Sequence, residues 1–382
     1  MALNLKVLSQ RLRQAREVLG YSVEDVCKNI GIDPTRLLDI ELAKQKPSGD
    51  EVLILASFYD CDFRAFLDET LPSPVETSDI LFRRFGEAFT ANDRRAIQQF
   101  LHLCVIEMEL ENALNEQKKS FSFKPSGTHY KTHGLQAAEA LRSQLGYRGI
   151  EAPRDIYADF RSIGIHIFRR RLSNAEISGL YVEHPIAGHC VLVNYDEDIY
   201  RQRFSVAHEV AHAIFDSAEG VAVTYQASSS KYNKNDYQEI RANSFASCYL
   251  MPPSMLNKLP QIDRSSAQHW AQHFRVSTAA FAKALKDAGL VDESGARAIR
   301  SVHVSTDNKI DPEAPLSLSA LQRDKRLALL EHGLSDYYVG LCLEAHYRNL
   351  ISTGRLTEAL GVDAAELSEV AALYGRTIGY GA

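Results

Sequence analysis

The segment His208–His212, with the sequence HEVAH, restricts the fold of this chain more than any other feature. It lies within residues 201–216, a largely apolar stretch that is typical of a buried helix. On such a helix two histidines four residues apart lie on one face, so both imidazoles can reach one ion. Imidazoles on a mostly buried helix need polar partners, and a metal ion supplies one to each. The motif therefore predicts a metal site.

Zinc is the metal expected at this motif, because it accepts neutral imidazole ligands readily. A catalytic zinc site has three protein ligands and an open position for water. Glu209 follows the first histidine and is expected to act on that water as a general base. The third ligand must come from elsewhere, because Phe215 stands where the extended HExxHxxGxxH motif requires glycine.

Glu239 is our candidate for the third ligand, because it lies at the start of a second predicted helix. Asn243 follows one turn later on the same face and is placed to support the metal shell through a hydrogen bond. Asp236 and Glu219 are alternatives in or near loops. A solvated carboxylate favoured by the helix dipole is another interpretation of Glu239, and the residues alone leave these options open.

Other polar residues near the motif have both a structural and a functional interpretation. A histidine or tyrosine there is a candidate to stabilise an oxyanion, although such side chains are more often satisfied core or surface groups. These candidates are His184, His189, Tyr232 and Tyr237. The arginines at 169–171 are expected to form a solvated strand end, with recognition of an acidic partner as the alternative.

Composition indicates a multidomain globular protein. The 382 residues suit two or three domains, with 45% hydrophobic and 24% charged residues. The net charge of −6 gives no overall attraction to nucleic acid. No stretch is apolar enough for a membrane span, and the N-terminus lacks the apolar core of a signal peptide. Six scattered cysteines without a CxxC pair argue against a disulfide framework and favour a reducing cytoplasm.

Helical periodicity and turn signals predict a mainly α fold with a small β-sheet, of the α+β class. Residues 1–70 form short helices with clear caps, namely Ser22 with Asp25 and Asp33 with Pro34. Strands are expected before the metal helix, within 166–195, and at the SVHVS segment (301–305). We expect a helical bundle over 1–70, a helical linker over 71–134, a metal-binding domain over 135–295, and a mostly helical region over 296–382.

Two parts of the chain resemble known families. RQRFSVAHEVAHAIF (201–215), EIRANSFASCYLMPPSML (239–256) and AQHFRVSTAAFAKALKDAGL (271–290) are similar to the ImmA/IrrE metallopeptidases, over roughly residues 140–290. That resemblance implies a zincin-like fold, with His208, His212 and Glu239 as zinc ligands and Glu209 as the catalytic glutamate. It also implies site-specific cleavage of a helix-turn-helix repressor after a stress or DNA-damage cue.

The N-terminal segment 8–48 resembles the xenobiotic-response-element (XRE, Cro/C1-type) helix-turn-helix family. In that family the helix over 34–42 enters the major groove of DNA. Its expected DNA contacts are Thr35 and Arg36 with bases, and Lys28, Lys44 and Lys46 with phosphates.

Several features of the N-terminal domain weaken the expectation of DNA binding without removing it. Residues 1–70 contain nine basic and twelve acidic side chains, a net charge of −3. Val23 stands where such domains commonly carry glutamine, and Asp39 and Glu41 put negative charge on the helix that would approach DNA. A domain kept for dimerisation, or for docking a related repressor, is the alternative.

These observations predict a zinc endopeptidase that regulates transcription or a stress or phage response by cleaving a partner repressor. DNA is a further expected partner through residues 1–70, and the chain is a candidate homodimer. The alternative is a transcriptional regulator whose metallopeptidase fold serves as a sensor or binding module with little turnover. Residues 296–382 are expected to sense the cue or cover the cleft.

Overall fold

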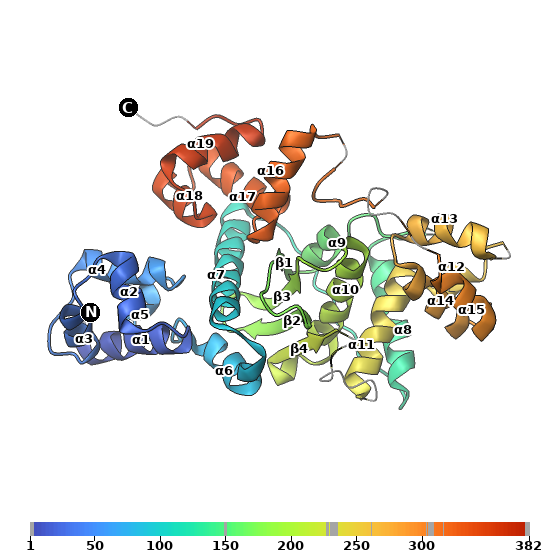
Figure 1. Ribbon diagram of the computed structural model, residues 1–382, viewed down its shortest axis with the longest axis horizontal. Helices are drawn as coiled ribbons and strands as arrows, with labels where there is room; N and C mark the ends of the chain where they lie inside the picture. The colour runs from blue at the N-terminus through green and yellow to red at the C-terminus, as the bar shows by residue number, and fades with distance from the viewer. Residues whose placement is uncertain are drawn as a thin grey trace.

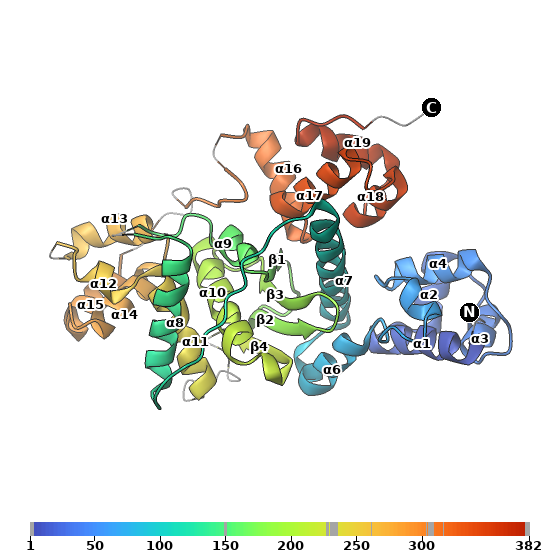
Figure 2. The ribbon, with the colours of Figure 1, turned by 180° about the vertical axis from the view of Figure 1, so that it is seen from behind.

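The computed structural model describes residues 4–148, 151–226, 229, 236–260, 262–302, 304, 309–315 and 317–378. Helices make up most of this part of the chain, and a small sheet lies near its centre (Figures 1 and 2). The α+β class expected from the sequence is confirmed.

The N-terminal helices are α1 (Leu5–Val18), α2 (Val23–Ile30), α3 (Pro34–Glu41), α4 (Gly49–Phe58) and α5 (Arg64–Leu67). They enclose a core of their own that includes Leu8, Leu12, Val26, Leu37 and Leu55. The predicted caps are confirmed: Ser22 and Asp25 form a capping box on α2, and Asp33 accepts hydrogen bonds at the start of α3, where Pro34 is the first residue. Local cap chemistry therefore fixes the boundaries of the helix-turn-helix pair.

The chain then continues through α6 (Glu76–Phe85), a short 3-10 turn (Gly86–Ala88) and α7 (Ala91–Leu114). Residues 71–134 were expected to form a linker, but α7 shares an apolar core with the sheet. Phe100, Leu103 and Cys104 of this helix are buried there. α7 is therefore a structural layer and not only a connection.

The following elements are α8 (Tyr130–Gln144), α9 (Ile156–Ser162), β1 (His166–Arg170), β2 (Ile177–His184), β3 (Gly188–Asn194), α10 (Ile199–Phe215), a 3-10 turn (Ser217–Glu219), β4 (Val221–Tyr225), α11 (Tyr237–Leu250), α12 (Pro253–Leu256), α13 (Arg264–Phe274), α14 (Thr278–Asp287) and α15 (Glu293–Arg300). The strand order is β1-β3-β2-β4, with β1 parallel to β3 and the other pairs antiparallel. Strands β1 to β3 confirm the prediction for 166–195.

Both faces of the sheet are buried, and its side chains alternate between two cores. Ile167, Tyr181 and Val191 face the core that contains α10 and α11. Phe168 and Leu192 face the core that contains α7. This alternation is the period of two that a strand requires. The sheet therefore separates the metal-motif helix α10 from α7.

The C-terminal region contains α16 (Ala320–Glu331), α17 (Asp336–Tyr347), α18 (Thr353–Leu360) and α19 (Ala364–Leu373), as the helical prediction expected. These helices lie against the end of α7 (Figure 1). The strand predicted at SVHVS was wrong for residues 301, 302 and 304, which are not in a strand, and residues 303 and 305 lie outside the described part.

All six cysteines are free thiols, in agreement with the expectation of no disulfide framework. Among the described residues, no helix is both long and apolar enough to cross a membrane.

Candidate metal centre

Helices α10 and α11 bring the three predicted metal ligands together. His208 and His212 lie one turn apart on α10, and Glu239 is in the first turn of α11. The Nε2 atoms of the two histidines are 3.2 Å apart. The carboxylate oxygens of Glu239 lie 3.4 Å from Nε2 of His208 and 3.5 Å from Nε2 of His212. Three side chains from two helices thus surround one point, with Oε2 of Glu239 nearer His208 and Oε1 nearer His212.

The donor set fits a zinc ion. Two nitrogen or oxygen ligands at zinc–ligand distances of about 2.0–2.1 Å in a tetrahedral shell are separated by roughly 3.3 Å. The two histidine nitrogens, 3.2 Å apart, are close to that value, and each of them lies 3.4 or 3.5 Å from a different oxygen of Glu239. Both histidines are at most 3% exposed, and Oε2 of Glu239 is buried without a hydrogen-bond partner among the described residues. A metal ion would satisfy this oxygen and both imidazoles.

Glu209 is fully buried beside the ligands, and neither of its carboxylate oxygens has a hydrogen-bond partner among the described residues. Burial raises the pKa of this carboxyl group, and the neighbouring histidines oppose that rise. Gly179 of β2 provides the space for it, because a Cβ atom there would lie 3.0 Å from Oε1 of Glu209 and 2.9 Å from the carbonyl oxygen of Leu192. An orphaned carboxylate held in this way is suited to proton transfer.

Asp216 is a functional candidate that the sequence analysis missed. Its Oδ2 atom lies 2.9 Å from Nδ1 of His212, and its other oxygen accepts hydrogen bonds from Arg241 and Gln238. A carboxylate on the second ring nitrogen orients a metal-binding histidine and fixes its tautomer. The sequence spacing could have indicated this contact, because Asp216 follows His212 by four residues and so lies one helical turn after it on the same side of α10.

The imidazoles and carboxylates of the site shift each other's pKa values. Burial disfavours the charged imidazole of His212, but hydrogen bonds with Asp216 and Glu239 raise its pKa to about 10. Burial acts to raise the pKa of Glu239, and the close imidazoles of both histidines lower it well below its usual range. Negative charge is therefore held where a cation would bind.

The competing ligand candidates lie elsewhere in the structure. Asp236 caps α11 through the backbone N–H of Gln238. Glu219 contacts Gln238 and pairs with Arg84 at 3.3 Å. Asn243 lies on α11 one turn after Glu239, as expected, and its role in the metal shell stays a prediction.

The residues considered for oxyanion stabilisation have other surroundings. His189 lies 2.6 Å from Glu183, and Nδ1 of His184 accepts hydrogen bonds from two backbone N–H groups of its own turn. Burial lowers the pKa of His184 to about 4. Tyr237 is 65% exposed and stacks on Tyr130. Tyr232 lies outside the described residues.

The prediction of a solvated strand end at 169–171 was wrong for Arg169, which is 1% exposed. Its guanidinium group pairs with Asp311 at 2.8 Å and with Glu313 at 2.6 Å. Glu313 also accepts from Arg161, so these arginines join the segment after α15 to the sheet.

A second group of potential ligands consists of Glu107, Glu111 and His166. Here Nδ1 of His166 lies 2.7 Å from Glu107, a hydrogen-bond distance, and Glu111 contacts Lys118 at 2.7 Å and the hydroxyl of Tyr337 at 2.6 Å. The protein itself supplies cationic and hydroxyl partners to this group, which distinguishes it from the cluster on α10 and α11.

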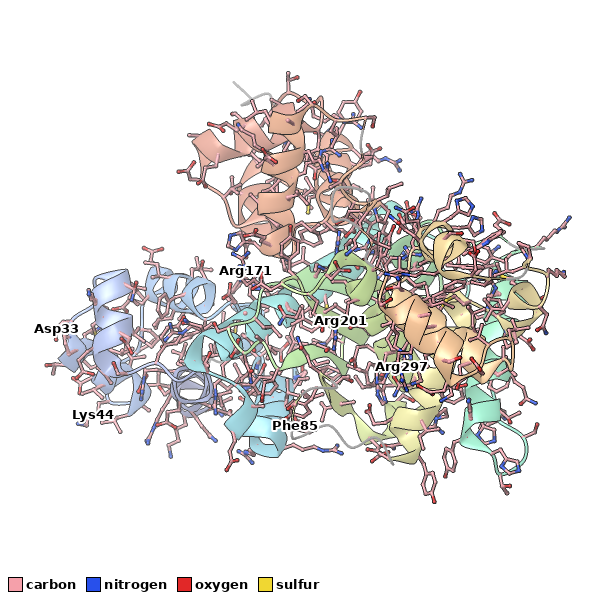
Figure 3. All side chains as sticks on the ribbon, turned by 45° about the vertical axis from the view of Figure 1, so that its right-hand side comes forward. Asp33, Lys44, Phe85, Arg171, Arg201 and Arg297 are labelled. Carbon is pink, nitrogen blue, oxygen red and sulfur yellow. The ribbon has the colours of Figure 1, made fainter. Side chains whose placement is uncertain are left out.

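The predicted DNA contacts lie at the outer end of the helix-turn-helix domain, where Figure 3 labels Asp33 and Lys44 away from the rest of the chain. Thr35, Lys28, Lys44 and Lys46 are exposed. Arg36 instead makes a two-pronged ion pair with Glu51, and it also donates to Gln45 and to the carbonyl oxygen of Lys46. As placed here, Arg36 braces α3 against α4.

The carboxylate of Glu41, expected to place negative charge on the DNA-facing helix, is buried inside the domain. Glu41 is 6% exposed and accepts two hydrogen bonds from Arg16 of α1, at 2.7 and 2.9 Å. Asp39 interacts with Gln45 and lies 3.8 Å from Lys44. The acidic count of the domain therefore overstates the negative charge on its outer face.

Comparison with protein families agrees with the two resemblances found in the sequence. Residues 160–286 match the family described as the IrrE N-terminal-like domain, and residues 12–66 match the family described as helix-turn-helix. The first match includes α10, α11 and all three candidate ligands. A search of curated proteins gave no match to the chain.

Proposed function

We propose that this chain, in which residues 12–66 match a helix-turn-helix family and residues 160–286 match the IrrE N-terminal-like domain family, is a zinc-dependent endopeptidase. Its proposed role is to regulate transcription, in a stress or phage response, by site-specific cleavage of a partner repressor. The observation that carries the proposal is the convergence of His208, His212 and Glu239 beside Glu209, which is buried and has no hydrogen-bond partner within the described part of the chain.

His208, His212 and Glu239 would hold the ion, which when bound supplies Lewis-acid chemistry to a peptide carbonyl group. Glu209 accepts a proton from the attacking water as the water oxygen adds to the carbonyl carbon. The C–N bond then breaks, and the proton passes from Glu209 to the nitrogen of the leaving amine. The apolar burial of Glu209 supports this role, because a carboxyl group with a raised pKa can both accept and return a proton.

The helix-turn-helix domain would bring the peptidase to DNA or to a partner protein of the same class. Its exposed Thr35, Lys28, Lys44 and Lys46 support a DNA contact, and its internal pairing of Glu41 removes one objection to it. The exposed Leu38 and Leu42 on the same helix face support a protein partner, including a second copy.

A DNA-binding regulator with little peptidase turnover is the second candidate. The helix-turn-helix domain is attached directly to α7, where Gln98 donates to the carbonyl oxygen of Asp60 and Arg95 lies 3.9 Å from the ring centroid of Tyr21. Because α7 packs on the face of the sheet opposite α10, metal occupancy would reach the DNA-binding domain through the sheet and would be the signal that this domain senses.

Replacement of Glu209 by glutamine distinguishes the two candidates. We expect Glu209→Gln to keep one zinc per chain and to reduce peptide hydrolysis at least 100-fold, because it removes the proton acceptor and leaves the ligands in place. The measurements are metal content and mass-spectrometric detection of new N-termini in a digested bacterial proteome.

Glu176→Gln is the matched control, since Glu176 is exposed and lies outside the ligand set. Unchanged hydrolysis in Glu209→Gln would contradict the peptidase mechanism. DNA regulation that depends on zinc, without any cleavage by the natural protein, would favour the second candidate.

A further inference from the structure

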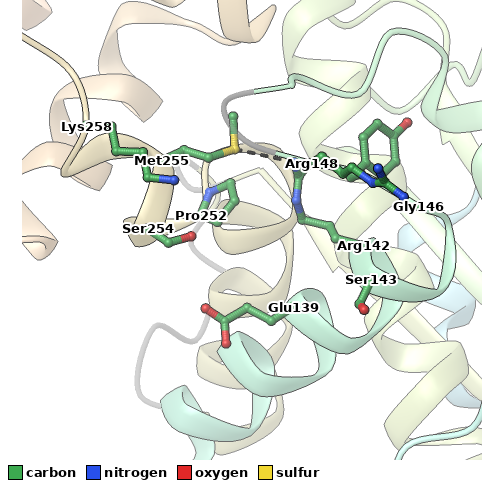
Figure 4. Close-up of a pocket in the computed structure, with 10 residues that line it drawn as sticks. Glu139, Arg142, Ser143, Gly146, Arg148, Pro252, Ser254, Met255 and Lys258 are labelled. Carbon is green, nitrogen blue, oxygen red and sulfur yellow. Dashed lines mark hydrogen bonds between the residues drawn. The ribbon is translucent and has the colours of Figure 1, made fainter.

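A separate cavity of about 520 Å³ lies between α8 with its following turn and α12. The metal ligands do not line it. Figure 4 shows Arg142 in the centre of the lining residues, with Lys258 on one side and Arg148 on the other. This volume is within the range of small-molecule and cofactor sites, which is roughly 300–1,000 Å³.

Arg142 forms the buried floor of the cavity. It is 6% exposed and donates to the carbonyl oxygens of Tyr249 and Glu151, each at 2.7 Å. No carboxylate forms an ion pair with it among the described residues, and its hydrogen-bond partners are neutral atoms. Burial accordingly lowers the pKa of Arg142. A buried cation of this kind is stabilised by an anion that enters the cavity.

Two further cations stand at the rim. Arg148 and Lys258 are exposed and make no ion pair with any described residue. Glu139 is the single carboxylate that lines the cavity among the residues described. Three cations against one anion give the lining a net charge of +2, in a chain whose overall charge is −6.

The remaining lining suits a ligand with a phosphate and a flat group. Ser143 and Ser254 offer hydroxyls, which are common phosphate donors. Tyr147 packs over the Arg142 guanidinium group at 4.8 Å and, with Pro252 and Met255, forms an apolar wall. We propose that this cavity binds a phosphorylated small molecule of nucleotide size, with the phosphate between Arg148, Lys258 and Arg142 and the flat group against Tyr147.

The cavity is joined to the metal centre by one helix. Arg142 holds the carbonyl oxygen of Tyr249 near the end of α11, and Glu239 lies in the first turn of the same helix. The ten residue steps from one to the other span roughly 15 Å of helix. A ligand that engages Arg142 thus acts on the element that carries the third metal ligand, which gives a chemical cue a direct route to the site.

The test is calorimetric titration of the full chain with adenosine monophosphate, inorganic phosphate and adenosine. We expect adenosine monophosphate to bind at one site, phosphate to bind more weakly, and adenosine to bind at least tenfold more weakly than the monophosphate. The double variant Arg148→Gln/Lys258→Gln should weaken binding of the monophosphate at least tenfold, because it removes two charge-assisted contacts.

Lys283→Gln/Arg297→Gln is the matched control, with the same change of charge at exposed cations that make no ion pair among the described residues. Circular dichroism establishes that each variant is folded. Failure of the natural chain to bind the monophosphate at millimolar concentration, or equal weakening by the two double variants, would overturn the proposal. Binding is independent of the peptidase proposal, so Glu209→Gln should bind the monophosphate as the natural chain does.

Discussion

At the scale of single residues, the proposed metal centre includes a contact with a carboxylate that the motif does not contain. Asp216 is 8% exposed and divides its two oxygens between His212 on one side and Arg241 with Gln238 on the other. Arg241 lies on α11, two residues after Glu239. Asp216 therefore contacts one proposed ligand on α10 and at the same time connects α10 to the helix that carries Glu239, the proposed third ligand.

Replacement of Asp216 by asparagine should weaken zinc binding by about 10- to 100-fold, the usual effect of losing a carboxylate partner of a metal-binding histidine. Competition with a chromogenic chelator measures this affinity. Glu219→Gln is the control, because Glu219 lies on the same turn but contacts no ligand. Equal zinc affinity of Asp216→Asn and the natural chain would show that Asp216 has no part in positioning His212.

The helix-turn-helix domain shows at the same scale why a charge count is a poor guide to a binding face. Glu41 and Glu51 are both acidic, yet each is bound to an arginine, Arg16 and Arg36 respectively. The ion pair with Arg36 lowers the pKa of Glu51 to about 2. The sequence shows how many charged residues the domain has. Which acidic side chains form ion pairs depends on contacts between helices, which only the folded structure shows.

At the scale of elements, the close crossing of α8 and α11 sets the position of Glu239. Gly134 of α8 makes this approach possible, since a Cβ atom there would lie 2.5 Å from the carbonyl oxygen of Arg241 and 2.6 Å from the backbone nitrogen of Phe245. Both neighbours are backbone atoms of α11 and cannot move independently. The side chain of Ser244 adds a hydrogen bond to the carbonyl oxygen of Lys131 at the same crossing.

Gly134→Ala should therefore separate the two helices. We expect a loss of stability of about 1–3 kcal/mol, as is typical of overpacking, together with weaker zinc binding because Glu239 moves with α11. Urea unfolding and chelator competition measure the two effects. Gly340→Ala is the control, because a Cβ atom at that helical glycine meets nothing within 4 Å. A stability loss no larger than that of the control would contradict the close packing.

Elements with strong local signals were predictable from the sequence. The caps of α2 and α3 and the strands β2 and β3 depend on contacts between near neighbours, which the sequence shows directly. Strand β4 had no such signal, because Val221–Tyr225 is short and becomes a strand only by pairing with β2. The two histidines and Glu209 followed from one motif, but the position of Glu239 depended on resemblance, and Asp216 and Gly179 depend on tertiary packing.

At the scale of the whole molecule, α7 connects three parts of the structure. Its Glu109 contacts Arg64 of the helix-turn-helix domain at 2.5 Å and Arg355 of α18 at 2.9 Å. Its apolar residues pack on the sheet, and its Glu107 meets His166 of β1. These groups are spread over one helix of 24 residues, so displacement of α7 affects all three parts together.

The pair of Glu107 on α7 and His166 on β1 makes the stability of the fold depend on pH. Burial disfavours the charged imidazole, but the hydrogen bond and charge of Glu107 raise the pKa of His166 to about 9. In the unfolded chain a histidine titrates near pH 6.5. The stabilisation is therefore complete below about pH 6.5 and is lost as the pH rises through about 9.

We accordingly expect the free energy of unfolding to fall by the order of 1–3 kcal/mol between pH 6.5 and 9, and His166→Gln to remove this fall. Urea unfolding followed by the fluorescence of Trp270, the single tryptophan, reports on the domain that contains β1. His129→Gln is the control, since His129 is exposed. His166→Gln also leaves Glu107 buried without its partner, so it should be less stable than the natural chain at pH 6.5 and approach it at pH 9. If the free energy of unfolding had the same pH dependence in the natural chain and in His166→Gln, protonation of His166 would not stabilise the contact between α7 and the sheet.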